Sequence, residues 1–98
     1  MADDVRSLPE TVLPDTVLPE TVVYWRPGCP FCSMLRAGLQ RKGISYREVN
    51  IWDDPAAAAF VRSVARGNET VPTVTVGSAS LVNPSAGEVA ELLAAAGR

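Results

Sequence analysis

The sequence feature that most constrains the fold of this chain is a pair of cysteines, Cys29 and Cys32, separated by two residues. They are the only cysteines among the 98 residues. An apolar run typical of a buried strand, residues 21–26, comes directly before them, and a run with helical periodicity, residues 30–42, follows. A C-x-x-C sequence between a strand and a helix is typical of a thiol redox site, because the helix N-terminus favours the negative charge of a thiolate.

Composition excludes several other classes of function. A net charge of −2 gives no electrostatic basis for binding nucleic acid or an anionic membrane, and no apolar run is long enough to span a bilayer. The N-terminus is acidic and Pro-rich, without the basic and apolar regions of a secretory signal. We therefore expect one cytoplasmic domain, in which two cysteines are more often catalytic or metal-binding than a structural disulfide.

A five-residue repeat, L-P-x-T-V, occupies residues 8–12, 13–17 and 18–22, and its third copy leads into the first strand. Prolines at five-residue spacing exclude a helix and weaken strand pairing. The spacing predicts an extended, polyproline-like N-terminal arm over residues 1–19, without chemistry of its own, followed by a folded domain over residues 20–98.

Hydrophobic periodicity and turn signals predict the element order β-α-β-α-β-β-α for the domain. Two strands joined through a helix must be parallel, whereas the closing hairpin is antiparallel. The predicted strands cover residues 21–26, 44–51, 73–76 and 79–82, the last two around a Gly77-Ser78 turn. The first predicted helix covers residues 30–42. The second begins with Asp53 or Asp54 as its cap, has Pro55 in its first turn and ends at Gly67-Asn68. The last helix begins at the capping box Ser85 to Glu88. Three apolar stripes should be buried: Cys32, Leu35 and Leu39; Ala57, Phe60, Val61 and Val64; and Val89, Leu92, Leu93 and Ala96.

This order, with C-P-F-C after the first strand and T-V-P-T at residues 70–73 before the third, resembles the thioredoxin fold in its glutaredoxin form. The resemblance covers residues 20–98 and implies an α/β fold with a four-stranded mixed sheet. The segments N-E-T-V-P-T-V from residue 68 and N-P-S-A-G-E-V from residue 83 look more specifically like the mycoredoxins. These are actinobacterial relatives that use mycothiol in place of glutathione, and the predominance of arginine over lysine agrees with such a source.

Two departures from typical glutaredoxins bear on the choice of small thiol. Arg26 replaces the lysine that shortly precedes the first cysteine, and Asn83-Pro84-Ser85 replaces a Gly-Gly turn with acidic residues. Glutathione carries carboxylates that favour cationic contacts, whereas mycothiol is an uncharged pseudodisaccharide that bears an acetylated cysteine. Hydroxyl and amide groups of Thr70, Asn83 and Ser85, with aromatic surface from Trp25 and Phe31, suit mycothiol better.

The cysteines are expected to have different roles. Cys29, at the helix start, should be the more exposed and more readily ionised sulfur, and its thiolate should attack the small-thiol side of a mixed disulfide and release the repaired protein thiol. Cys32, on the buried stripe, should be shielded and act only as a resolving thiol. In a monothiol cycle a second small thiol takes over that role, and Cys32 becomes dispensable.

The resemblance also implies that Pro72 follows a cis peptide bond and faces the active cysteine. Backbone groups of Thr70 and Val71 would then pair with an incoming extended thiol like an added strand. Tyr24 and Trp25 should face opposite sides of the first strand, with one in the core and Trp25 a candidate to line the groove. Ser85 is first a helix cap and second a contact for the ligand.

Three alternative functions remain open from the sequence. The first is a dithiol electron donor to ribonucleotide reductase, fed by thioredoxin reductase, although the W-S-G-F-R-P type segment of such redoxins is absent. The second is a dimeric [2Fe–2S] carrier that uses Cys29 and a small thiol. The third is a non-catalytic adaptor whose arm binds a partner. For the favoured activity we expect a monomer without a tightly bound cofactor or metal, with mycothiol (or glutathione) as co-substrate. Its partners would be mixed-disulfide proteins and the mycothiol reductase system.

Overall fold

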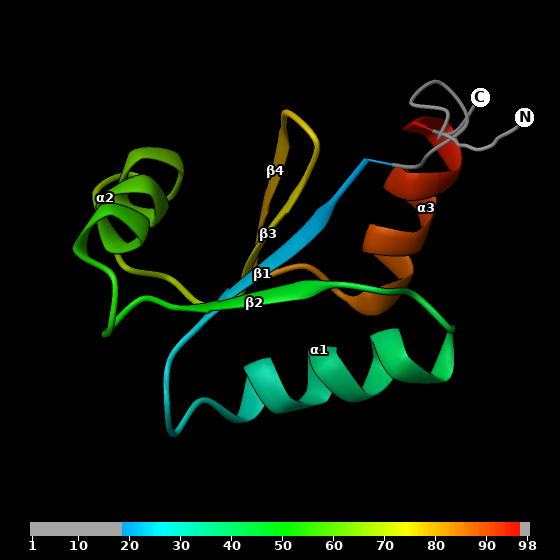
Figure 1. The fold of residues 1–98 in the computed structure, drawn as a ribbon, viewed down its shortest axis with the longest axis horizontal. Coiled ribbons are helices and arrows are strands. Elements are labelled where there is room, and N and C mark those ends of the chain that lie inside the picture. The colour runs from blue at the N-terminus through cyan, green and yellow to red at the C-terminus, as the bar shows by residue number, and fades with distance from the viewer. Residues whose placement is uncertain (1–18, 97–98) are drawn as a thin grey trace, which may run out of the picture.

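A computed structural model gives the structure of the protein and describes residues 19–96. The predicted N-terminal arm lies outside the described residues, apart from Pro19. The elements occur in the predicted order β-α-β-α-β-β-α (Figure 1). They are β1 (Thr21–Trp25), α1 (Pro30–Arg41), β2 (Arg47–Asn50), α2 (Pro55–Val64), β3 (Thr73–Val76), β4 (Ala79–Val82) and α3 (Ala86–Ala96). In the described residues no helix combines the length and the apolar character needed to cross a membrane.

The strands form one four-stranded mixed sheet in the order β2-β1-β3-β4. The pair β1–β2 is parallel, as expected for strands connected through α1, and the pairs β1–β3 and β3–β4 are antiparallel. The hairpin turns at Gly77, whose φ of 60° lies in the left-handed region that glycine adopts without steric cost. The α/β fold class with a four-stranded mixed sheet is confirmed.

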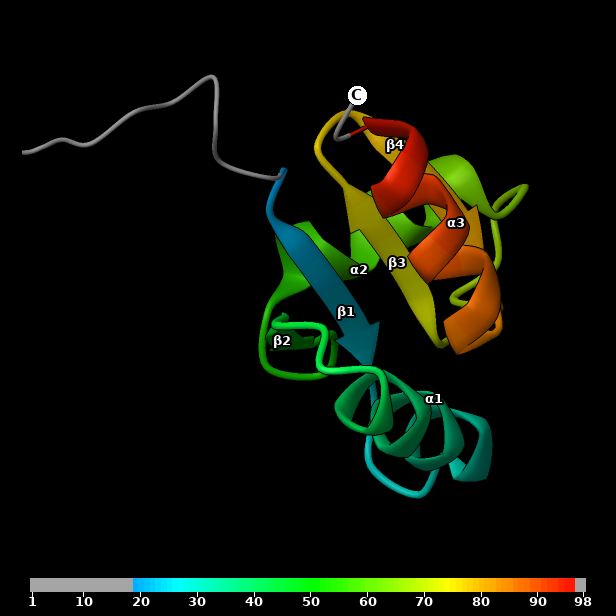
Figure 2. The same ribbon diagram turned by 90° about the vertical axis from the view of Figure 1, so that its right-hand side faces the viewer.

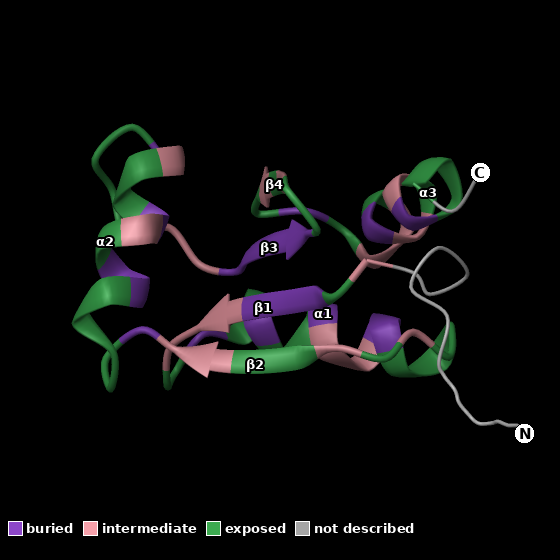
Figure 3. Cartoon of the chain, turned by 45° about the horizontal axis from the view of Figure 1, so that its top comes forward, coloured by how far each residue is buried: buried purple, intermediate pink, exposed green. Residues whose placement is uncertain are grey.

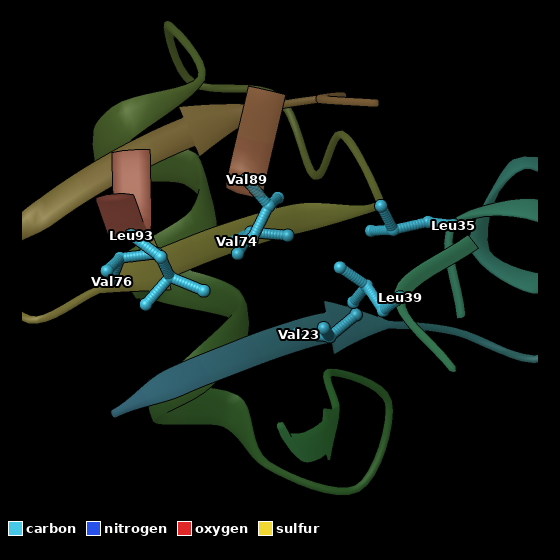
Figure 4. Close-up of a cluster of buried hydrophobic side chains, with 7 residues drawn as sticks. All are labelled: Val23, Leu35, Leu39, Val74, Val76, Val89 and Leu93. Atoms are coloured by element: carbon cyan, nitrogen blue, oxygen red, sulfur yellow. The ribbon is translucent and has the colours of Figure 1, made fainter. Parts of the chain in front are cut away.

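Helices cover both faces of the sheet, with α1 and α3 on one face and α2 on the other (Figures 1 and 2). The α1–α3 side holds a core in which side chains from two strands and two helices converge (Figure 4). Its buried members are Val23, Leu35, Leu39, Val74, Val76, Val89 and Leu93. The α2 side holds a second cluster of small and branched residues, namely Ile51, Ala57, Ala58, Val61 and Ala65. The central strand β3 is buried along its whole length (Figure 3).

Local signals explain where the helices begin and end. The Asp54 side chain accepts hydrogen bonds from the first-turn amides of α2, so the second of the two predicted caps is the one used. Ser85 and Glu88 exchange side-chain and backbone hydrogen bonds of 3.1 and 2.8 Å, which confirms the capping box. In α1, Gly38 permits close approach to α3, since a Cβ atom there would lie 2.8 Å from the Cβ of Ala86.

Two predictions about the fold were wrong in detail. The second strand was expected over residues 44–51 but β2 covers only Arg47–Asn50. The amides of Gly43 and Ile44 instead bond to the Gln40 and Leu39 carbonyls and close the end of α1, a use of the backbone that competes with strand pairing. Ala96 was expected in the buried stripe of the last helix but is exposed, because α3 ends there beyond the edge of the core.

Candidate active site

Cys29 caps the N-terminus of α1. Its backbone is extended (φ −102°, ψ 103°), and its Sγ accepts a hydrogen bond of 3.2 Å from the amide of Cys32. Pro30 occupies the first helical turn, where a backbone N–H would have no hydrogen-bond partner within the helix, so its absence in proline costs nothing. A sulfur in this position accepts a hydrogen bond from an amide of the first helical turn and lies at the positive end of the helix dipole.

The loop before β3 lies opposite Cys29. The Val71–Pro72 peptide bond is cis, as the resemblance implied, and the Cys29 thiol lies 3.8 Å from the Val71 carbonyl oxygen to which it donates. Two hydrogen bonds of 2.8 Å fix the loop, from the Thr73 hydroxyl to the Thr70 carbonyl and from the Asn83 amide to the Pro72 carbonyl. The fold thus brings the Cys29 sulfur into contact with the Val71 backbone, 42 residues further along the chain.

Cys32 differs from Cys29 in exposure, and the pKa of Cys32 is raised. It is fully buried whereas Cys29 is 8% exposed, so the predicted order of exposure is confirmed. Both thiols are free. Burial and the hydrogen bond with Cys29 are the largest of the causes that raise the pKa of Cys32 to about 11; the charge of Cys29 raises it further, whereas the Arg26 backbone and, least of all, the Arg36 charge lower it. At neutral pH Cys32 is therefore a thiol, and it must lose its proton before it can attack a disulfide.

A groove of about 320 Å³ lies between α1 and the start of α3. It brings together three of the predicted binding residues, Phe31, Asn83 and Ser85, and Phe31 is 61% exposed. Arg41, which the sequence reasoning missed, also lines it. Arg41 follows Met34, another lining residue, by seven residues and so lies on the same face of α1, but the sequence does not show that this face borders the start of α3. The remaining lining residues are Met34, Leu35, Gly38, Pro84 and Ala86.

The aromatic residues of β1 face opposite sides, as predicted. Tyr24 packs against Phe60 of α2, with ring centroids 5.1 Å apart. Trp25 lies on the α1 side, where the guanidinium of Arg36 stacks 4.8 Å from the centre of its ring. Trp25 is not among the residues that line the groove, so the structure brings Phe31, Asn83 and Ser85 together without it.

A larger hollow of about 580 Å³ lies at the opposite end of β1 from Cys29. Its lining includes Glu20, Tyr46 and Arg47 and neither cysteine. In residues 19–96 no three or more cysteine, aspartate or glutamate side chains converge as a metal site would require. Neither cysteine lines the smaller groove either, but that groove includes Phe31, which lies between the two cysteines in the chain, so the groove and not the larger hollow borders the C-x-x-C segment.

The arrangement has the parts needed for thiol–disulfide exchange. The less buried of the two sulfurs, at the helix N-terminus, can attack a disulfide, and the Val71 backbone beside it offers hydrogen bonds to an extended partner. A second sulfur three residues away can displace the partner by forming an internal disulfide. The groove next to Phe31 provides apolar, amide and hydroxyl surface for the group attached to the attacked sulfur.

Comparison with known proteins agrees with this geometry. The glutaredoxin family model matches residues 21–80. A Mycobacterium tuberculosis protein with a glutaredoxin name is 47% identical over 77 residues, which are 76% of this chain and 92% of the relative. Mycoredoxin 1 of Corynebacterium glutamicum is 37% identical over 68 residues, covering 68% and 84% of the two chains. The solved structure of the glutaredoxin-like NrdH-redoxin of Escherichia coli matches with a TM-score of 0.64 at 23% identity, over 74% of this chain and 93% of that one, and this likeness concerns the fold alone.

Proposed function

The chain belongs to the glutaredoxin family of thiol–disulfide oxidoreductases, and we propose that it reduces mixed disulfides between proteins and mycothiol through the Cys29 thiolate. The observation that carries the proposal is the position of Cys29 Sγ, at the N-terminus of α1 and 3.8 Å from the Val71 carbonyl. The activity would reside in residues 20–98, act in the cytoplasm and need no tightly bound cofactor.

The proposed reaction proceeds by two exchanges. The Cys29 thiolate attacks the mycothiol-side sulfur of the mixed disulfide, the bond between that sulfur and the client protein breaks, and the client leaves as a thiolate that takes a proton from water. A second mycothiol thiolate then attacks the Cys29–mycothiol bond, so mycothiol disulfide leaves and the Cys29 thiolate is regenerated. A reductase for mycothiol disulfide supplies the electrons. Cys32 is not required in this cycle.

The groove supports mycothiol as the small thiol. The side chains of Asn83 and Ser85 offer amide and hydroxyl groups, and Phe31, two residues after Cys29, offers a flat apolar surface in the same groove. These groups match an uncharged sugar derivative, and a relative is a mycoredoxin. Arg41 is the one charged residue of the lining, so a carboxylate of glutathione would find a single cation there. Thr70 and Val71 would bind the cysteine portion of either thiol through their backbone groups.

The test is turnover of one mycothiolated protein with mycothiol and its reductase, beside the same protein glutathionylated and supplied with glutathione and its reductase. We expect kcat/KM with mycothiol to exceed that with glutathione by about tenfold or more, equivalent to about 1.4 kcal/mol of binding to the transition state. Equal turnover with glutathione would refute the preference for mycothiol. It would leave the exchange chemistry of Cys29 untouched.

Two neighbouring cations provide a matched pair of variants for this test. Arg41 lines the groove, whereas the adjacent Lys42 is exposed and does not. Arg41→Gln should reduce turnover of the glutathione substrate and leave that of the mycothiol substrate almost unchanged, because only glutathione presents a carboxylate to this cation. Lys42→Gln should change neither. A large loss of mycothiol turnover in Arg41→Gln would mean that the groove binds its ligand by charge.

The same assay separates the alternative functions. A dithiol electron donor of the ribonucleotide-reductase type would be reduced directly by thioredoxin reductase, without a small thiol, and would need Cys32. A [2Fe–2S] carrier would absorb visible light after purification and elute as a dimer. Turnover with mycothiol by a colourless monomer that thioredoxin reductase does not reduce is the result we expect.

A further inference from the structure

Arg36 is a charged residue that the proposed exchange at Cys29 does not use. It follows Cys32 by four residues in α1, so the two side chains project from the same face of the helix. That face packs on the sheet, and the Arg36 side chain is only 24% exposed. A cation is therefore held in a largely dry position one helical turn from a fully buried thiol.

Contacts with the sheet fix the guanidinium in place. It stacks on the Trp25 ring at 4.8 Å, and its Nη1 lies 3.6 Å from Glu48 Oε1 on β2. Glu48 is the register partner of Val23, and Trp25 is two residues further along β1, so all three lie on the α1 face of the sheet. Nη1 is buried and makes no hydrogen bond. The distance from Nη1 to Glu48 is too long for a hydrogen bond, so the buried Nη1 donor is left unsatisfied. An unsatisfied buried donor lowers stability, which is unexpected if the only role of the ion pair is to attach α1 to the sheet.

The other charged groups around Cys32 are few. Cys29 lies at the start of the same helix, and the negative charge of its thiolate opposes ionisation of Cys32. Arg26, in the loop between β1 and α1, reaches the Cys32 sulfur through its backbone, while its guanidinium lies 6.0 Å from the centre of the Trp52 ring. The residues of β3 (Thr73–Val76) are uncharged. Arg36 is therefore the charged side chain that favours a Cys32 thiolate, and Glu48 is the carboxylate that opposes Arg36.

We propose that Arg36 is a positioning residue for Cys32: its guanidinium supplies positive charge to the Cys32 sulfur when that sulfur closes the disulfide with Cys29, and Glu48 limits that charge. The proposal rests on the proposed function only in placing the mixed disulfide on Cys29. It makes the balance between the monothiol and the dithiol cycle depend on two residues outside the groove.

The step that Arg36 assists is an internal exchange. Cys32 loses its proton to water, and its thiolate attacks Sγ of Cys29 while Cys29 is bonded to the sulfur of a small thiol. The Cys29–Cys32 bond forms, the bond between Cys29 and the small thiol breaks, and the small thiol leaves with the electron pair. A cation beside Cys32 stabilises the thiolate that must form first, so it raises the fraction of protein that can close.

A purely structural ion pair makes a different prediction. If the pair only attached α1 to β2, removal of either partner would loosen the same contact, and both variants would change closure in the same direction. If charge acts on the sulfur, the two variants have opposite effects. Arg36→Met removes the favourable charge and slows closure, whereas Glu48→Gln removes the charge that offsets Arg36 and accelerates it.

The experiment uses the full chain and one equivalent of an uncharged dipyridyl disulfide, which releases a coloured thiopyridone at each exchange. Attack by Cys29 releases the first equivalent, and closure by Cys32 releases the second. At neutral pH we expect the second phase to be about three to ten times slower in Arg36→Met and about two to five times faster in Glu48→Gln. The closure rate rises with the fraction of Cys32 that is ionised, and a lower nucleophilicity of the more readily formed thiolate offsets part of that rise. The pH profile of this phase should move to higher pH in the first variant and to lower pH in the second.

Matched controls come from an ion pair at the opposite end of β1 from Cys29. Arg47 and Glu20 are 3.0 Å apart there, so Arg47→Met and Glu20→Gln should leave both phases unchanged. Arg36→Lys should restore most of the closure rate, because it keeps the charge. Slower closure in both Arg36→Met and Glu48→Gln, or no change in either, would overturn the proposal, and Glu48→Gln decides the matter even if Arg36→Met does not fold.

The outcomes also keep this proposal apart from the proposed function. A preference for glutathione over mycothiol in turnover would refute the proposed function. It would leave the closure phase as expected, since the dipyridyl reagent replaces both thiols. Release of a second equivalent by Cys32→Ser would show that Cys32 does not perform the closure and would overturn the role of Arg36.

Discussion

Replacement of Cys29 by serine should lower turnover of a mycothiol mixed disulfide by about a thousandfold or more, to the level of uncatalysed exchange. The physical reason is the loss of the nucleophile, because a hydroxyl does not ionise near neutral pH and is a poor attacker of disulfides. Cys32 cannot substitute for it. It is fully buried, and its raised pKa of about 11 keeps it protonated. The measurement is kcat/KM in the coupled reductase assay.

Cys32→Ser is the matched control for this variant. It makes the same change of sulfur to oxygen three residues away, and in a monothiol cycle it should retain turnover within about threefold of the native chain. Loss of turnover in Cys32→Ser as severe as in Cys29→Ser would contradict the monothiol cycle. It would favour the dithiol mechanism instead.

Leu39→Ala should lower the free energy of unfolding by about 2–5 kcal/mol, a large fraction of the stability of a small domain. Leu39 is fully buried in the cluster that joins α1 to β1, β3 and α3, and truncation leaves a cavity in that cluster (Figure 4). The midpoint of thermal unfolding should fall by roughly 8–40 °C, at about 4–8 °C per kcal/mol for a domain of this size. Denaturant unfolding measures the change directly.

Met34→Ala is the matched control, since it truncates an apolar side chain in the same helix. Met34 is 67% exposed, so its truncation should change the unfolding free energy by no more than about 0.5 kcal/mol. Similar losses in the two variants would mean that α1 is not anchored through the Leu39 face. The position of Cys29 at the start of that helix would then need another explanation.

Most of the fold was predictable because local and long-range signals agree. Pro30 and Pro55 at helix starts, the Asp54 cap and the capping box of Ser85 and Glu88 each fix one boundary by backbone hydrogen bonding, which acts over a few residues. The two errors arise where sequence preference and tertiary context disagree. Ile44 and Tyr46 have strand-forming side chains, yet the Ile44 amide, which a longer strand would have paired, bonds to the Leu39 carbonyl at the end of α1.

The candidate site was predictable in its chemistry and less so in its geometry. The C-x-x-C spacing and its place before a helix identify the sulfurs and their order of exposure from local structure alone. The pairing of Cys29 with Val71 joins distant residues, and it came from the family resemblance. Arg41 and Arg36 were missed because a cation on a helix is ordinarily solvated. Only the packing of α1 against the sheet and α3 shows that Arg41 lines the groove and that Arg36 is held against Trp25 and Glu48 of the sheet.

The most direct test is to trap the first covalent intermediate. The native chain is mixed with a small excess of mycothiol disulfide, quenched with acid within the first turnover and mapped by peptide mass spectrometry. We predict mycothiol bonded to Cys29 with Cys32 free and, in any molecules that have already closed, a Cys29–Cys32 disulfide without bound mycothiol. Mycothiol bonded to Cys32, with Cys29 unmodified, would contradict the assignment of the helix-capping sulfur as the nucleophile.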